Sequence, residues 1–151
     1  MKLSQNKILI TGGATGIGLG LTERFILENN TVIICGRRAE ALSDVKRKFP
    51  EVITKVCDLS IESERIELFS WIKENHPDLN ILVNNAGIQN WMNLTDEDFY
   101  EKSLSEIETN IIAPVHLTRL FIDLPSAETI LNVTSGLAFV QLTKEIGRAH
   151  V

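Results

Sequence analysis

The sequence contains few cysteines, few aromatic residues and no long hydrophobic run. Aromatic residues make up 6% of the 151 residues, with a single tyrosine. The two cysteines, Cys35 and Cys57, lie at the ends of apolar runs, which favours buried free thiols over a disulfide or a metal pair. The longest apolar runs, such as Thr31 to Cys35, are far too short to span a bilayer. Residues 1–7 lack the hydrophobic region of a signal peptide. We therefore expect a cytoplasmic protein with no membrane partner.

The sequence also lacks an excess of positive charge. Its 15 Lys and Arg residues are interspersed with 20 Asp and Glu residues, for a net charge of −5. This balance argues against nucleic acid as a partner. The hydrophobic fraction of 44% and charged fraction of 23% are ordinary for a soluble globular protein, and the length favours one domain.

Short β-branched runs alternate with longer segments of helical periodicity. This pattern predicts βαβ units, and the nearly all-apolar runs predict parallel strands covered by helices on both faces. The expected strands lie near residues 7–11, 31–35, 52–57, 79–83 and 129–134. The expected helices are 17–28, 39–48, 63–74 and 104–121, with an irregular acidic segment at 89–103 that carries a short helix. The predicted fold is an α/β, Rossmann-type doubly wound sheet of about five strands.

A glycine cluster joins the first expected strand to the first expected helix. It reads TGGATGIG from Thr11 to Gly18. Glycines at 12, 16 and 18 leave room for a sharp turn beside a diphosphate, and the helix would aim free N–H groups at that anion. Such a cluster can also serve an ordinary turn, but its place in a βαβ unit favours dinucleotide binding. A phosphate-loop site is excluded because no Gly-Lys-Ser/Thr follows.

The second expected strand ends in two arginines and no acid. An acid at this place would bind the ribose 2′-hydroxyl of NAD, whereas this strand ends in Gly36-Arg37-Arg38. Guanidinium groups offer forked, charged donors that suit a 2′-phosphate, so the sequence favours NADP(H) over NAD(H). Alternatively, these arginines only cap the strand and solvate a helix start. Asp58 follows the third strand at the same edge, where a surface turn would also use aspartate.

Three further motifs give the sequence a specific resemblance. The fourth strand ends in Asn84-Asn85-Ala86-Gly87, Asn110 stands in ETNIIAP, and the fifth strand continues through LNVTS to Ser135. With the glycine cluster and Asp58-Leu59, these motifs resemble the short-chain dehydrogenase/reductase family over residues 4–142. The chain is similar to the N-terminal part of a bacterial-type short-chain oxidoreductase. The resemblance implies a nicotinamide cofactor, a carbonyl or alcohol substrate and a homo-oligomeric parent.

The resemblance also implies roles for individual residues. Three groups would surround the cofactor: the diphosphate loop (Gly12, Gly13, Thr15, Gly16, Ile17, Gly18), the 2′-phosphate and adenine contacts (Arg37, Arg38, Asp58, Leu59) and the nicotinamide ribose contacts (Asn84, Ala86, Gly87). Among catalytic residues, Ser135 would hydrogen-bond the substrate oxygen, and Asn110 would hold a water of the proton relay. No metal is implied. The plainer alternative is that Asn84 and Asn110 satisfy backbone groups and Ser135 ends a strand.

The family's proton donor, a tyrosine followed four residues later by a lysine, does not occur in the sequence. An unperturbed tyrosine has a pKa near ~10, so a neighbouring ammonium must favour the phenolate. The i,i+4 spacing puts both groups on one helical face. Tyr100 is the only tyrosine, Leu104 stands four residues later, and we expect Tyr100 to be a packing residue. The position that the family's spacing gives the tyrosine falls on Arg148.

The last seven residues, EIGRAHV, have an unusual reading at the DNA level. They can be back-translated as GAG ATC GGA AGA GCA CAC GTC, which from its second base matches a common short-read sequencing adapter that continues into a stop codon. We hypothesise that residues 145–151 are adapter read-through after a truncated NAD(P)-binding Rossmann domain, residues 1–144. A genomic continuation of EIGRAHV on resequencing would contradict this. The fifth strand would then keep an unpaired apolar edge, so we expect an inactive, aggregation-prone chain.

The sequence thus predicts an NADP(H)-preferring oxidoreductase for the full-length parent. It would transfer a hydride between the nicotinamide cofactor and a carbonyl or secondary alcohol. The alternative from another class is a non-catalytic NADP(H)-binding redox sensor. A Tyr-x-x-x-Lys pair in the true downstream sequence would favour the enzyme, and its absence would favour the sensor.

Overall fold

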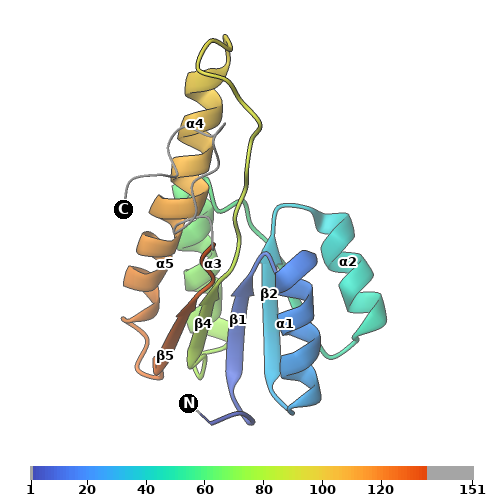
Figure 1. The fold of residues 1–151 in the computed structure, drawn as a ribbon. Helices are drawn as coiled ribbons and strands as arrows, with labels where there is room; N and C mark the ends of the chain where they lie inside the picture. Colours follow the sequence, from blue (N-terminus) through green and yellow to red (C-terminus); the bar gives the residue numbers. More distant parts are fainter. Residues whose placement is uncertain (1, 136–151) are drawn as a thin grey trace.

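The structure, a computed structural model, describes residues 2–135 and alternates strands with helices along this whole range (Figure 1). The strands are β1 (Lys7–Thr11), β2 (Thr31–Gly36), β3 (Ile53–Val56), β4 (Ile81–Asn84) and β5 (Thr129–Asn132). The helices are α1 (Gly16–Leu27), α2 (Ala39–Lys48), α3 (Glu62–Asn75), α4 (Phe99–Ile107) and α5 (Ala113–Phe121), with a π-helical turn, η1 (Glu108–Ile112), before α5. The five expected strands and the first three expected helices are confirmed, apart from shifts of a few residues at their ends.

The five strands form one parallel sheet in the order β3-β2-β1-β4-β5. The chain builds the sheet outward from β1 to β3, then crosses to β4 on the other side of β1. Loops that leave β1 and β4 therefore diverge and open a crevice at the carboxyl ends of these strands. The Rossmann-type doubly wound sheet is thus confirmed, and β5 is its edge within residues 2–135.

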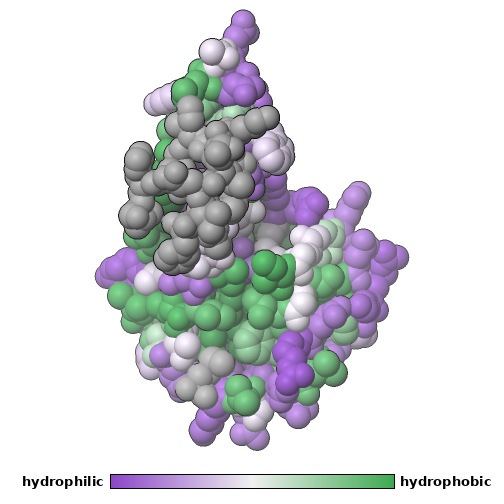
Figure 2. Space-filling view, viewed as in Figure 1, coloured by the Kyte–Doolittle hydropathy of each residue, from purple (hydrophilic) through white to green (hydrophobic). Residues whose placement is uncertain are grey.

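Two apolar layers hold helices against both faces of the sheet. Successive side chains of a strand point to opposite faces. Leu9 and Ile33 accordingly pack with α3 and α5, whereas Ile10 and Ile34 pack with α1 and α2. All four side chains are fully buried. Figure 2 shows apolar side chains gathered in a band over the lower half of one face, with polar side chains beyond it on the α2 side.

The last long helix departs from the sequence prediction. It was expected over 104–121, but α4 already begins at Phe99 and continues through η1 into α5. A helix is predicted from apolar residues that recur with helical spacing because they form one buried stripe. Since α4 has no buried residue, its first turns lack that signal. The packing role expected for Tyr100 is wrong: it lies in α4 with 71% of its surface exposed.

No helix within residues 2–135 is long and apolar enough to cross a membrane. The remainder of the predicted Rossmann domain up to residue 144, the proposed tail at 145–151 and the position of Arg148 lie outside the described residues.

Candidate functional site

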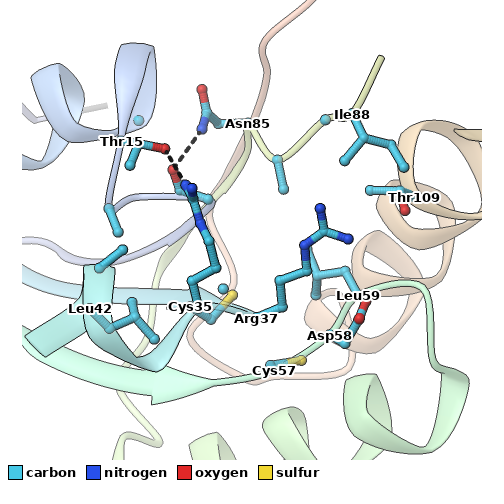
Figure 3. A pocket seen from close by; sticks show the side chains of 18 of the residues that line it. Thr15, Cys35, Arg37, Leu42, Cys57, Asp58, Leu59, Asn85, Ile88 and Thr109 are labelled. Atoms are coloured by element: carbon cyan, nitrogen blue, oxygen red, sulfur yellow. Dashed lines mark hydrogen bonds between the residues drawn. The ribbon is translucent and has the colours of Figure 1, made fainter. Parts of the chain in front are cut away.

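A cleft of about 340 Å³ opens at the carboxyl ends of the strands, at the crevice between the β1 and β4 loops (Figure 3). It brings together many of the residues that the sequence predicted for the cofactor: Gly12, Thr15, Ile17, Gly18, Arg37, Arg38, Asp58, Leu59, Ala86 and Gly87. Residues from four strand ends that are far apart in the sequence thus line one cavity. Gly13 and Gly16 are not among the lining residues.

The glycine turn that follows β1 is closely packed against the β4 loop. Gly12 has a φ of +65°, a conformation that residues with a Cβ rarely adopt. A Cβ added to Gly18 would lie 2.9 Å from the Gly12 carbonyl carbon and closer still to its oxygen. Gly13 is buried instead, where a Cβ would lie 2.8 Å from the Ile34 Cβ. Gly13 therefore fits the turn to the core, while Gly12 and Gly18 shape the cleft wall.

The N-terminus of α1 faces the cleft, and among residues 2–135 it has neither a capping side chain nor an acid in its first turn. Thr15 is the N-cap residue but its side chain makes no capping hydrogen bond, and the first turn of α1 contains no acid. Thr15, Ile17 and Gly18 all line the cleft. Since the first N–H groups of a helix lack intrahelical acceptors and carry partial positive charge, this turn suits an anion such as a diphosphate.

Two arginines bring positive charge to the cleft from the end of β2. Both are exposed, and Figure 3 shows Arg37 extending into the middle of the cleft. Arg38 donates from Nη2 to the Thr15 Oγ1 at 3.2 Å, which holds it against the glycine turn. Within residues 2–135 neither arginine forms an ion pair with an acid. Asp58 also lines the cleft, but its Oδ1 accepts hydrogen bonds from the backbone and hydroxyl of Ser60.

Thr11 and Asn85 fix the floor of the cleft, and the sequence analysis missed both roles. The buried Thr11 Oγ1 accepts hydrogen bonds from the backbone N–H groups of Asn85 and Ala86, each at 2.9 Å. Asn85 returns a bond from Nδ2 to the Thr11 carbonyl at 2.9 Å. The ends of β1 and β4 are thus locked together. A threonine directly before the glycines and a second asparagine in the Asn-Asn motif were the available signals.

Replacing Thr11 by valine is expected to lower the free energy of unfolding by about 2 kcal/mol. Valine keeps the shape but leaves two backbone N–H groups without their acceptor, and an unsatisfied buried group costs about 1–3 kcal/mol. Urea unfolding followed by circular dichroism measures the change. Thr31→Val, at an exposed strand position, is the matched control and should change little. Equal stability of the two variants would contradict the role of Thr11.

A second cavity, beside the first, collects the other three predicted residues. Asn84, Asn110 and Ser135 line it together, and Ile88 lines both cavities. Asn84 is buried and donates from Nδ2 to Asn132 Oδ1 at 2.9 Å, while its own Oδ1 has no partner among the described residues. Asn110 accepts from the Ile88 N–H at 2.8 Å and donates to the Ile88 carbonyl at 2.7 Å. The plainer alternative for Asn110, satisfying backbone groups, is what its side chain does here.

The sequence profile of the short chain dehydrogenase family matches residues 6–146. This match covers the strands, the glycine turn and both cavities. The chain belongs to the short-chain dehydrogenase family.

Relatives and solved structures of this family agree with the fold. The chain is 46% identical over 146 residues to the uncharacterised oxidoreductase DltE of Bacillus subtilis strain 168, covering 92% of this chain and 57% of that protein. The Pseudomonas aeruginosa RhlG/NADP complex superposes with a TM-score of 0.86 at 24% identity, covering 97% of this chain and 61% of RhlG. A serine dehydrogenase in complex with NADP⁺ gives a TM-score of 0.79 at 27% identity, over 91% and 57% of the two chains. The chain thus spans little more than half the length of these proteins.

Two buried thiols also line the cleft. Cys35 and Cys57 are free and buried, as predicted, and both line the cleft. Burial raises the pKa of Cys57 from 9.0 to about 12, with the nearby acids Glu64 and Asp58 adding to the effect. Burial, and then the proximity of Cys57, raises the pKa of Cys35. Both thiols therefore stay protonated in the folded chain at neutral pH.

These raised pKa values predict that the chain loses stability in alkali. Below pH 9 both states keep the thiol protons, whereas above it the unfolded chain releases protons that the folded chain retains. The free energy of unfolding should therefore fall as pH rises from 9 toward 12, by up to about 1.4 kcal/mol per pH unit for each thiol. Urea unfolding at several pH values measures the slope. The Cys35→Ala/Cys57→Ala variant should lose most of it; an unchanged slope would contradict the assignment.

Proposed function

We propose that this chain is the NADP(H)-binding part of an oxidoreductase that acts on a carbonyl or secondary alcohol. The observation that carries the proposal is the pair Arg37 and Arg38 in the cleft, at the end of β2, where an acid would favour NAD. A guanidinium suits a phosphate because its forked N–H donors form charge-assisted hydrogen bonds. The uncapped α1 N-terminus supplies a second anion site in the same cleft, as a dinucleotide with a 2′-phosphate requires.

We assign each part of NADP(H) to a group of residues around the two cavities. The turn from Gly12 to Gly18 would hold the diphosphate, with Arg37 and Arg38 at the 2′-phosphate. Asp58 and Leu59 would border the adenine, and the Asn84, Ala86 and Gly87 segment would border the nicotinamide ribose. When bound in this way, the nicotinamide would supply the hydride for reduction of a carbonyl carbon, and the alkoxide formed would take a proton from the proton relay. The serine dehydrogenase complex with NADP⁺, at 27% identity, supports this choice of cofactor.

We assign the second cavity to the substrate, which would lie there next to the nicotinamide. Ser135 and Asn110 line it together with Ile88. We assign to Ser135 a hydrogen bond with the substrate oxygen, which would orient the carbonyl for hydride transfer. Asn110 would hold a water of the proton relay from a π-helical turn, a feature frequent at functional sites.

A second candidate function is a non-catalytic NADP(H) sensor. The observation in its favour is that Tyr100, the only tyrosine of the sequence, is exposed on α4 and is followed at i+4 by Leu104. The cleft and its arginines would serve both functions equally. We expect the 151-residue chain to bind NADPH without oxidising it, and the full-length parent to oxidise it with a carbonyl substrate.

Two nucleotide fragments test the proposal at the arginines. 2′,5′-ADP carries the 2′-phosphate that 5′-AMP lacks, so 2′,5′-ADP should bind the chain at least about tenfold more tightly, since a hydrogen bond to a charged group contributes about 1.5–3 kcal/mol. Fluorescence competition against NADPH measures both affinities. Equal affinities would contradict the 2′-phosphate site, and no binding of any of these nucleotides would contradict the proposed function itself.

A further inference from the structure

Arg65 of α3 is a buried cation beside the apolar layer formed by α3 and α5. Its surface is 2% exposed, and its helix neighbours Leu68 and Phe69 belong to the same layer. Removing a guanidinium from water is costly unless its donors are paired. Three acceptors meet this need: Nη1 donates to the Leu59 carbonyl and to Glu108 Oε1 at 2.8 Å, and Nε donates to His116 Nδ1 at 3.1 Å.

These acceptors belong to three separate segments of the chain. Leu59 follows β3 and lines the cleft beside Asp58. Glu108 is the first residue of η1, and His116 lies in α5. Arg65 therefore connects the wall of the cleft directly to the helix that borders both cavities. A hydrophobic residue at position 65 could pack in the same layer but could not make these connections.

The turn that Arg65 holds is the one that carries Asn110. A π-helical turn is rare and less regular than the helix around it, so its geometry depends on outside contacts. Here η1 contributes Thr109 to the first cavity and Asn110 to the second. Asn110 in turn binds the N–H and the carbonyl of Ile88. Arg65 is thus linked by hydrogen bonds to η1, and η1 to the far wall of the cleft.

We propose that Arg65 is a positioning residue that fixes Leu59 and the η1 turn in one arrangement and so sets the place of Asn110 and Ile88. This inference rests on the proposed function, in which Leu59 borders the adenine and Ile88 lies toward the nicotinamide. Arg65 is not among the residues that line the cleft. Its hydrogen bonds go to the Leu59 carbonyl, Glu108 and His116. Its effect on the cofactor passes through these groups.

The first test uses the chain without cofactor and follows hydrogen exchange of the Ile88 amide by NMR. Glu108→Ala cuts the link from Arg65 to η1 at a half-buried position, where the variant should fold. Loss of a hydrogen bond to a charged group should raise the Ile88 exchange rate about tenfold. Glu108→Gln keeps an acceptor oxygen and should restore most of the protection. Glu101→Ala, an exposed acid on the neighbouring α4, is the matched control and should leave the rate unchanged.

The outcomes separate positioning from general stability. Glu108→Ala should also lower the urea midpoint, because it removes an acceptor of the buried guanidinium. Rapid Ile88 exchange in this variant, measured without denaturant, together with rescue by Glu108→Gln supports the proposal. An Ile88 rate in Glu108→Ala equal to that of the unaltered chain overturns it, as does equal loosening by Glu108→Gln and Glu108→Ala. Arg65→Met should raise exchange at both Leu59 and Ile88 if it folds; the Glu108 variants decide the question without it.

A second test compares the binding of two ligands and asks whether the Arg65 contacts affect cofactor binding. Glu108→Ala leaves the Arg65 bond to the Leu59 carbonyl, so 2′,5′-ADP should bind within about twofold of its original affinity. NADPH, which also reaches the nicotinamide end, should bind about fivefold more weakly, a loss within the range of one hydrogen bond. Equal weakening of both ligands overturns the positioning role. Failure of both ligands to bind the unaltered chain would contradict the proposed function, while the ligand-free exchange test of Arg65 would still stand.

Discussion

Replacing Gly18 by alanine should reduce NADPH binding by about a hundredfold, equivalent to about 2.7 kcal/mol. The added Cβ would lie 2.9 Å from the Gly12 carbonyl carbon and inside contact distance of its oxygen, so backbone and not a flexible side chain would have to move. Overpacking of this kind costs about 1–3 kcal/mol. The turn would shift away from Asn85 and carry the α1 N-terminus out of line with the diphosphate. A fluorescence titration with NADPH measures the loss.

Gly20→Ala is the matched control, because it makes the same substitution two residues later in the same helix. An added Cβ at Gly20 meets nothing within 4 Å. Alanine in a helix interior is favoured over glycine by about 1 kcal/mol, so this variant should bind NADPH normally and unfold at a higher urea concentration. NADPH binding by Gly18→Ala equal to that of Gly20→Ala would contradict the place of the diphosphate at this turn.

Replacing Arg37 by aspartate should change the cofactor preference. The variant would lose the charge-assisted donor that we propose for the 2′-phosphate and would place there a carboxylate that repels this group. NADPH affinity should fall about a hundredfold, since a hydrogen bond to a charged group alone is worth about 1.5–3 kcal/mol. NADH carries a 2′-hydroxyl that the new carboxylate can accept from, so its affinity should hold or rise. Titrations of both nucleotides against the variant measure the two changes.

Arg47→Asp controls for net charge, because it makes the same charge change on the exposed surface of α2. It should weaken NADPH binding only slightly, through long-range electrostatics that salt screens. The NADPH affinity of Arg37→Lys should lie between those of the unaltered chain and Arg37→Asp, since lysine keeps the positive charge but lacks the forked N–H donors of a guanidinium. A parallel fall of NADPH and NADH affinity in Arg37→Asp would place Arg37 away from the 2′-phosphate and contradict the proposed contact.

The sequence predicted the sheet and the cleft residues because both depend on local signals. Apolar strands that are buried on both faces stand out in the sequence as short apolar runs. The polar residues Arg37 and Asn85 mark where the second and fourth of these strands end. Parallel strands bring their carboxyl ends to one edge, so residues after β1, β2, β3 and β4 had to meet. The glycine positions followed from the same logic, although Gly13 serves packing against Ile34 and does not line the cleft.

What the sequence did not reveal depends on contacts between distant segments. The exposed start of α4 has no buried stripe that would mark it in the sequence, and the π-helical turn that carries Asn110 has no buried residue either. Arg65 did leave a signal: with Leu68, Phe69 and Ile72 it completes the i, i+3, i+4, i+7 stripe of α3. A cation on an apolar stripe implies buried partners, but only the fold shows that these are Leu59, Glu108 and His116.

We expect the cleft to prefer a dinucleotide that carries a 2′-phosphate. The most direct test of this preference is the ratio of the NADH and NADPH dissociation constants for the unaltered chain at one ionic strength. Charge-assisted hydrogen bonds to the phosphate predict that NADPH binds at least about tenfold more tightly than NADH. Equal dissociation constants, or tighter binding of NADH, would contradict this preference.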